Sequence, residues 1–119
     1  MTLISVVVVG LVALLHACFL ILEMFLWDKP MGLKVFGQTI EQAGTTKVLA
    51  ANQGLYNGFI AAGLILGLLQ GDAGFDITVF FLSCIIVAGV FGAFTANRKI
   101  IFVQALPGLI GLLLVVFTR

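Results

Sequence analysis

Residues 3–27 read LISVVVVGLVALLHACFLILEMFLW, an apolar run that contains one acidic residue, Glu23. A helix needs about 20 predominantly apolar residues to cross a bilayer, so this run is long enough to do so. Three further stretches meet the same test, at residues 47–69, 77–96 and 100–117. The sequence therefore predicts an all-α fold, an integral membrane four-helix bundle in which residues 1–119 form a single domain.

The composition agrees with this prediction and excludes other classes. Hydrophobic residues make up 62% of the chain and charged residues only 9%, whereas soluble domains carry about 25% charged residues. The formal net charge of +1 provides no clustered basic face, so nucleic acid is not an expected partner. No metal-binding, phosphate-binding or nucleophile motif is present, and we expect neither a metal nor a cofactor.

The connection between the first two spans, residues 28–46, is the one sizeable polar stretch. It opens with Asp28-Lys29-Pro30 and is expected to be a loop with one interfacial turn. Its apolar side chains Val35, Phe36 and Ile40 are expected at the level of the lipid headgroups. The other two connections are short enough to be tight turns between antiparallel helices.

Positive charge predicts the orientation of the bundle. Four of the six basic residues fall in the first and third connections, and a fifth, Lys47, begins the second span on the same side of the membrane. The positive-inside rule places this side in the cytoplasm. Both termini are then expected on the non-cytoplasmic side. The five residues are Lys29, Lys34, Lys47, Arg98 and Lys99, and the sixth is Arg119.

Glu23 is the polar residue that most needs an explanation, because a carboxylate costs several kcal/mol in hydrocarbon. His16 lies seven residues earlier, only about 20° away around a helix. Trp27 lies one turn later, about 40° away. The pattern predicts one face of the first helix that carries Glu23 and His16 as catalytic candidates and Trp27 as a binding residue.

The second span carries the densest polar run. Asn52 and Tyr56 are four residues apart, as are Gln53 and Asn57, so these pairs are neighbours on a helix surface. On a largely different face, small residues recur every four positions and would let another helix approach closely. A homodimer through this small-residue face is a possible partner interaction. The small residues are Ala50, Gly54, Gly58 and Ala62.

Counting about 1.5 Å per residue from the cytoplasmic helix ends places these groups at two depths. Three helices contribute, whereas the outer half of the bundle is almost wholly apolar. The pattern predicts a polar pocket that is closed to the outside. The shallower layer contains Glu23, Asn52, Gln53 and Gln104, and the deeper layer contains His16, Tyr56 and Asn57.

Each polar residue also has a structural interpretation. The amides and Tyr56 can be interhelical hydrogen-bond partners, worth about 0.6 to 2 kcal/mol each. Trp27 can be an interfacial anchor, and His16 can bond a neighbouring carbonyl group. An acid inside a membrane helix is functional by default, so Glu23 carries the functional interpretation.

The motif residues resemble a known family. His16, Glu23 and Trp27, followed by Asn-Gln-Gly-x-Tyr-Asn-Gly at residues 52–58, are similar to the DUF1304 family of small four-span bacterial membrane proteins. The resemblance covers nearly the whole chain. It implies a multi-pass protein of the inner (plasma) membrane and assigns no activity.

Three functions fit these residues. The first is a membrane-embedded pocket that binds a small amphiphilic or lipid-like molecule, with Glu23 and His16 available for proton transfer. The second is a dimeric, proton-coupled small exporter, as in small multidrug-resistance proteins, although the amide-rich second span departs from that pattern. The third is an accessory subunit whose polar groups only fasten helices together.

Overall fold

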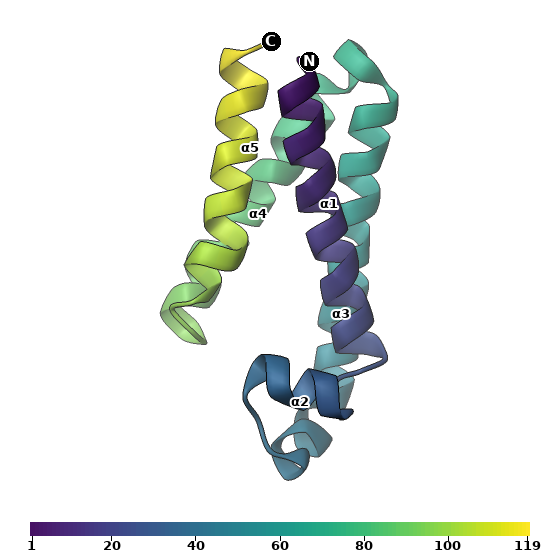
Figure 1. The fold of residues 1–119 in the computed structure, drawn as a ribbon, viewed down its shortest axis with the longest axis vertical. Helices are drawn as coiled ribbons and strands as arrows, with labels where there is room; N and C mark the ends of the chain where they lie inside the picture. Colours follow the sequence, from purple (N-terminus) through teal and green to yellow (C-terminus); the bar gives the residue numbers. More distant parts are fainter. The chain divides into compact units, whose positions relative to one another are not determined.

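The chain is almost entirely helical in a computed structural model that describes all 119 residues. No β-strand is present, so the all-α prediction is confirmed. The elements in chain order are α1 (Leu3–Met24), α2 (Pro30–Phe36), α3 (Ile40–Leu69), the 3-10 turn η1 (Gly71–Gly74), α4 (Phe75–Thr95), the π-helical turn η2 (Ile101–Ala105) and α5 (Leu106–Phe117) (Figure 1).

Three segments are long and apolar enough to cross a membrane: Leu3–Met24, Ile40–Leu69 and Gly71–Thr95. The last apolar segment, Ile101–Phe117, is shorter. Large apolar side chains are exposed along these helices, for example Leu11, Val87 and Phe94, as expected where lipid replaces water as the solvent. The protein thus has the helices of a membrane protein, while the fourth span and the outward termini stay predictions.

The chain divides into two compact units. The terminal unit comprises Met1–Ala13 and Ala62–Arg119, and the central unit comprises Leu14–Ala61. Helices α1 and α3 each contribute residues to both units. Every polar residue predicted for the site except Gln104 belongs to the central unit.

Helix α1 ends at Met24, three residues before the predicted end. The amides of Phe25 and Leu26 both bond the carbonyl of Ile21, at 3.0 and 3.2 Å, and this closes the last turn. Pro30 then forces the preceding residue, Lys29, into an extended conformation, with φ −93° and ψ 163°. Residues 25–29 are therefore a connecting turn, and α2 begins directly at Pro30.

Helix α3 begins at Ile40, seven residues before the predicted start. The reason is a reciprocal cap: the amide of Gln42 donates to Thr39 Oγ1 at 3.2 Å, and the amide of Thr39 donates to Gln42 Oε1 at 2.9 Å. This Thr-x-x-Gln pattern is a capping box, which satisfies two amides at a helix start. The predicted loop 28–46 is thus largely helical, and α2 ends at Phe36 and is capped by Gly37, whose φ is +60°.

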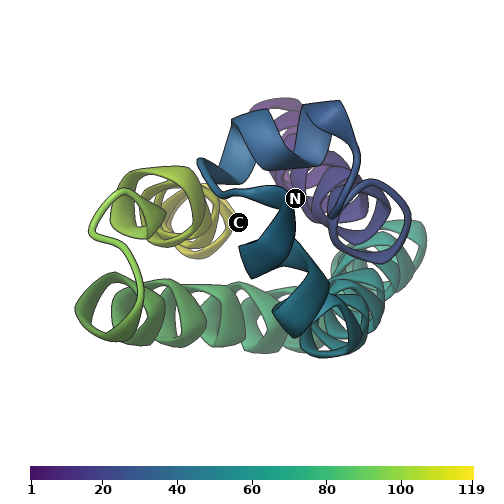
Figure 2. The ribbon, with the colours of Figure 1, turned by 90° about the horizontal axis from the view of Figure 1, so that it is seen from below.

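In the terminal unit, α4 packs against η2 and α5 (Figure 2). Gly89 permits this approach, because a Cβ atom there would lie 2.6 Å from the Ala105 amide nitrogen. Pro107 has no amide hydrogen to donate to residue 103, and the preceding turn widens so that the Leu106 amide bonds Ile101 O. The proline thus explains the π-helical turn.

Glycines also allow the end of α3 to pack against the start of α4. A Cβ atom on Gly74 would clash with the carbonyl oxygen of Gly67, so only glycine fits this contact. Thr78 is fully buried beside it. The turn between α3 and α4 is therefore fixed by backbone packing.

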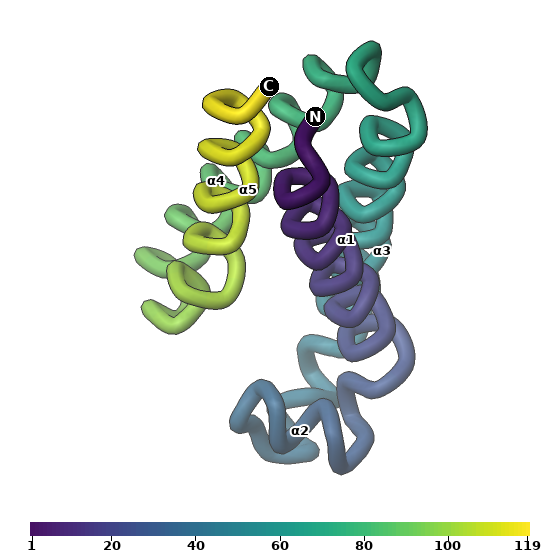
Figure 3. Tube along the Cα trace, turned by 45° about the horizontal axis from the view of Figure 1, so that its top comes forward, coloured from purple at the N-terminus to yellow at the C-terminus, as the bar shows by residue number.

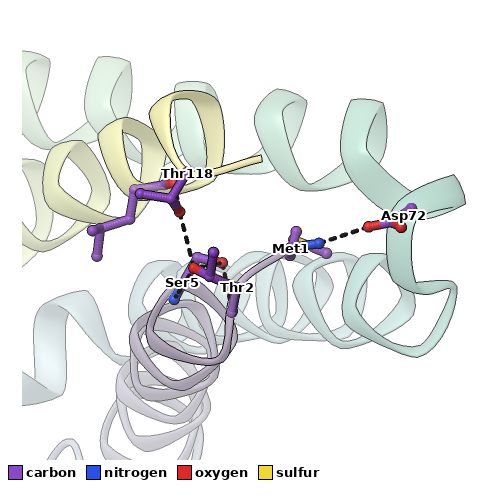
Figure 4. Close-up of polar contacts among 6 residues, drawn as sticks. Met1, Thr2, Ser5, Asp72 and Thr118 are labelled. Atoms are coloured by element: carbon purple, nitrogen blue, oxygen red, sulfur yellow. Dashed lines mark hydrogen bonds and ion pairs between the residues drawn. The ribbon is translucent and has the colours of Figure 1, made fainter.

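A polar cluster joins the two ends of the chain in the terminal unit (Figure 4). The Met1 amino group pairs with Asp72 Oδ1 at 2.6 Å. Thr2 Oγ1 lies 2.9 Å from Thr118 Oγ1, and Ser5 Oγ donates to Thr2 O at 2.8 Å. These contacts hold the start of α1 against the end of α5.

Candidate functional site

Glu23 lies in the last turn of α1, and its carboxylate contacts the neighbouring helix. Asn57 Nδ2 on α3 donates to Glu23 Oε1 at 2.5 Å. Both side chains are half-buried, and both belong to the central unit, where the end of α1 runs beside the first half of α3 (Figure 3). The acid singled out by sequence is thus hydrogen-bonded to an amide of the second long helix.

Small residues on α3 bring the two helices together at this point. A Cβ atom on Gly54 would lie 2.6 Å from Met24 Cγ and 3.1 Å from Leu20 O, and one on Gly58 would lie 2.5 Å from Leu20 Cδ1. Part of the predicted small-residue face therefore packs on α1 of the same chain. A homodimer through this face stays a prediction.

Side-chain direction explains why Glu23 pairs with Asn57, which the depth count had placed in the deeper layer. Helical side chains lean toward the N-terminus of their own helix. Glu23 on α1 leans away from the α1–α3 connection, and Asn57 on the antiparallel α3 leans toward it. The two groups meet about one helical turn deeper than Asn52 and Gln53. The predicted depths did not include this lean, because they were counted from the backbone rise per residue alone.

His16 is completely buried, and its ring meets the Phe19 ring edge-on with centroids 5.6 Å apart. It lies seven residues before Glu23 on α1, about 10 Å along the helix axis. A molecule in contact with both groups would have to span that distance. The predicted shared face is therefore an extended strip rather than a single acid–base pair.

Trp27 is not on α1, because the helix ends before it. Its indole Nε1 donates to Thr46 Oγ1 at 3.1 Å, and its ring packs on Phe36 with centroids 4.7 Å apart. The side chain therefore ties the turn after α1 to α2 and to the start of α3. The sequence did not identify Thr46 or Phe36 as partners, since both were assigned to a loop.

Three of the other candidates lie on the exposed surface of α3. Asn52 is exposed, and its amide donates to Val48 O of its own helix at 2.9 Å. Gln53 and Tyr56 are exposed on the surface of α3. Gln104 belongs to η2 in the terminal unit. Only Asn57 among the predicted binding residues is in hydrogen-bond contact with Glu23.

The described chain contains no group of three or more His, Cys, Asp or Glu residues that could hold a metal ion. Cys18 and Cys84 are both free thiols. Two surface hollows lie in the terminal unit, one on α4 and one beside η2. What the central unit offers chemically is a carboxylate, an amide and a partly exposed helix contact.

Asp28, in the turn after α1, accepts a hydrogen bond from Lys47 Nζ at 3.0 Å. This contact holds the pKa of the Asp28 carboxyl below its ordinary value. The folded pKa is thus lower than the unfolded pKa of about 3.9. The contribution of the pair to stability is therefore complete above that value and disappears as the pH falls through the folded pKa.

We expect amide exchange in residues 28–46, corrected for intrinsic rates, to accelerate as the pH falls through this range. Lys47→Met should remove the part of the acceleration that comes from Asp28. Lys34→Met is the matched control, because Lys34 is exposed and in no ion pair. Identical pH profiles for the two variants would contradict the assignment.

The comparisons with known proteins agree with the motif. The family described as "Protein of unknown function (DUF1304)" matches residues 10–116. The chain is 34% identical over 106 residues to a protein named "Uncharacterized protein YpaA" from Lactococcus lactis subsp. lactis (strain IL1403), covering 87% of this chain and 89% of that protein. No solved structure matches the chain. The chain therefore belongs to the DUF1304 family of proteins of unknown function.

Proposed function

We propose that Glu23 and Asn57 form the polar centre of a membrane-embedded site that binds a small amphiphilic or lipid-like molecule. The observation that supports this proposal is that only one oxygen of the Glu23 carboxylate accepts a hydrogen bond. Oε1 accepts the Asn57 hydrogen bond, whereas Oε2 receives none from the chain. An acid inside an apolar helix is costly unless a partner compensates it, and a bound polar head group would complete that compensation.

The proton-transfer part of the proposal requires His16. Because His16 lies about 10 Å from Glu23 along α1 and is completely buried, proton transfer to it requires the packing around His16 to open.

A structural role is the second candidate, because Asn57 fastens α3 directly to the Glu23 carboxylate. Glu23→Gln separates the two functions. The glutamine keeps an oxygen that accepts the Asn57 hydrogen bond, and it removes the charge. The variant should therefore fold and assemble normally under both proposals.

We expect native mass spectrometry of the wild-type protein, released from bacterial membranes, to detect a co-purified amphiphile at defined stoichiometry. The adduct should be absent from Glu23→Gln and present in Glu41→Gln, in which an exposed acid of the first turn of α3 is changed. A wild-type protein without any adduct, together with an unaltered Glu23→Gln, would favour the structural role.

We also propose four spans in the inner membrane, with both termini outside. The basic connections and the apolar Ile101–Phe117 segment support this topology. In a chain with Cys18 and Cys84 replaced by serine, a membrane-impermeant maleimide added to whole cells should label Ala73→Cys. Lys34→Cys should react only after lysis, and the reverse pattern would overturn the topology.

A further inference from the structure

We propose that the molecule bound at Glu23 and Asn57 is a cationic amphiphile, with an ammonium head and an apolar chain. This inference rests on the proposed function and names the ligand class of the same site. It follows from the charges of the central unit and from the amide of Gln53, which lies beside Asn57 on α3.

Glu23 is an acid without a counter-ion in the central unit. The ion pairs of the protein are Lys47 with Asp28 and the Met1 amino group with Asp72, and neither includes Glu23. The neighbouring donor, Asn57, is neutral. A ligand that brings a positive charge supplies what the helix contact lacks, because opposite charges attract strongly where water is partly excluded.

The amide of Gln53, one turn from Asn57, is suited to an ammonium ion. On α3, Gln53 lies about 40° and Tyr56 about 100° around the helix from Asn57. Both side chains are exposed, Tyr56 by 55%, and its ring lies next to that of Phe59 with centroids 6.1 Å apart. An amide oxygen attracts cations, and Gln53 is the nearer of the two to Asn57 around the helix.

Gln53 is therefore the α3 side chain that can add an amide oxygen beside the Glu23–Asn57 contact, whereas Tyr56 lies about 160° around α3 from Gly54, on the face turned away from α1. An anionic head group would be repelled by Glu23, and a neutral one would leave the carboxylate without a counter-charge. The apolar chain of the ligand would lie in the hydrocarbon of the bilayer, where its apolar surface stays out of water.

Trp27 provides the readout, since it is the one tryptophan of the chain and follows Glu23 by four residues. The probes are three nitroxide-labelled amphiphiles with the same chain and with trimethylammonium, hydroxyl or sulfate head groups. The protein is held in phosphatidylcholine nanodiscs, and quenching of Trp27 fluorescence is titrated with each probe.

We expect saturable quenching by the cationic probe at a concentration about tenfold lower than for the neutral probe, as an ion pair in a partly buried site gives. Glu23→Gln should abolish this preference, and Glu41→Gln should keep it. Glu23→Asp also alters the side chain but retains its charge, and it should keep a preference for the cationic probe. This variant therefore distinguishes loss of the charge from a folding defect caused by substitution at residue 23.

The outcomes separate the two proposals. Saturable binding of all three probes with equal affinity supports an amphiphile site and overturns the cationic ligand class. A preference for the sulfate probe, which the lysines of the α1–α3 connection could produce, also overturns it. Quenching by none of the probes beyond unsaturable partitioning overturns both the ligand class and the proposed function.

Discussion

Replacing Gly74 by alanine is expected to destabilise the protein by about 1–3 kcal/mol, the usual cost of overpacking. The added methyl group would clash with the Gly67 carbonyl oxygen. This oxygen belongs to the backbone, so it cannot move to another rotamer as a side chain could. The turn between α3 and α4 must then open. The free energy of unfolding, measured by SDS titration in mixed micelles, tests this expectation.

Gly10→Ala is the matched control. A Cβ atom at Gly10 in α1 meets no atom within 4 Å, and alanine favours a helix over glycine by about 0.5–1 kcal/mol. This substitution should therefore leave stability unchanged or raise it. Equal losses for Gly74→Ala and Gly10→Ala would show that the close contact at Gly74 is absent.

Replacing Asn57 by leucine should produce the second large effect, because it leaves the half-buried Glu23 carboxylate without its hydrogen-bond donor. An unsatisfied polar group costs about 1–3 kcal/mol, and more when it is charged. We expect that loss in SDS unfolding, together with loss of the amphiphile adduct. In a Glu23→Leu background the same substitution should cost much less, since the acceptor is already gone.

Asn52→Leu is the control for this prediction. Asn52 is on the same helix, is exposed, and donates to the Val48 carbonyl of its own backbone. Its replacement should alter stability only slightly, because lipid or solvent can accommodate leucine there. If Asn57→Leu and Asn52→Leu were equally mild, the bond to Glu23 would contribute nothing measurable.

Apolar length predicted the helical class and the three longest helices, because the hydrophobic requirement of a bilayer leaves a strong signal in the sequence. Helix ends were harder to predict. The start of α3 depends on two hydrogen bonds between Thr39 and Gln42, and the polar residues around them outweighed that short capping pattern. The end of α1 at Met24 placed Trp27 in a turn rather than on the helix.

The candidate site was predicted in its main residues and not in its pairing. Glu23 was identified from the energetic cost of an acid in a membrane helix, and Asn57 from its place in an amide-rich run. Their contact depends on side-chain lean and on the close approach allowed by Gly54. The sequence pattern indicated such an approach, but it did not show whether the partner was α1 or a second copy of the chain.

The hydrogen bond from Asn57 to the Glu23 carboxylate is the contact on which the proposed site depends. The most direct test is the side-chain amide resonance of Asn57 in ¹⁵N-labelled protein in nanodiscs. We predict that it is protected from solvent exchange and shifts strongly in Glu23→Gln, while Glu41→Gln leaves it unchanged. An Asn57 resonance that exchanges freely and is the same in all three proteins would contradict the account.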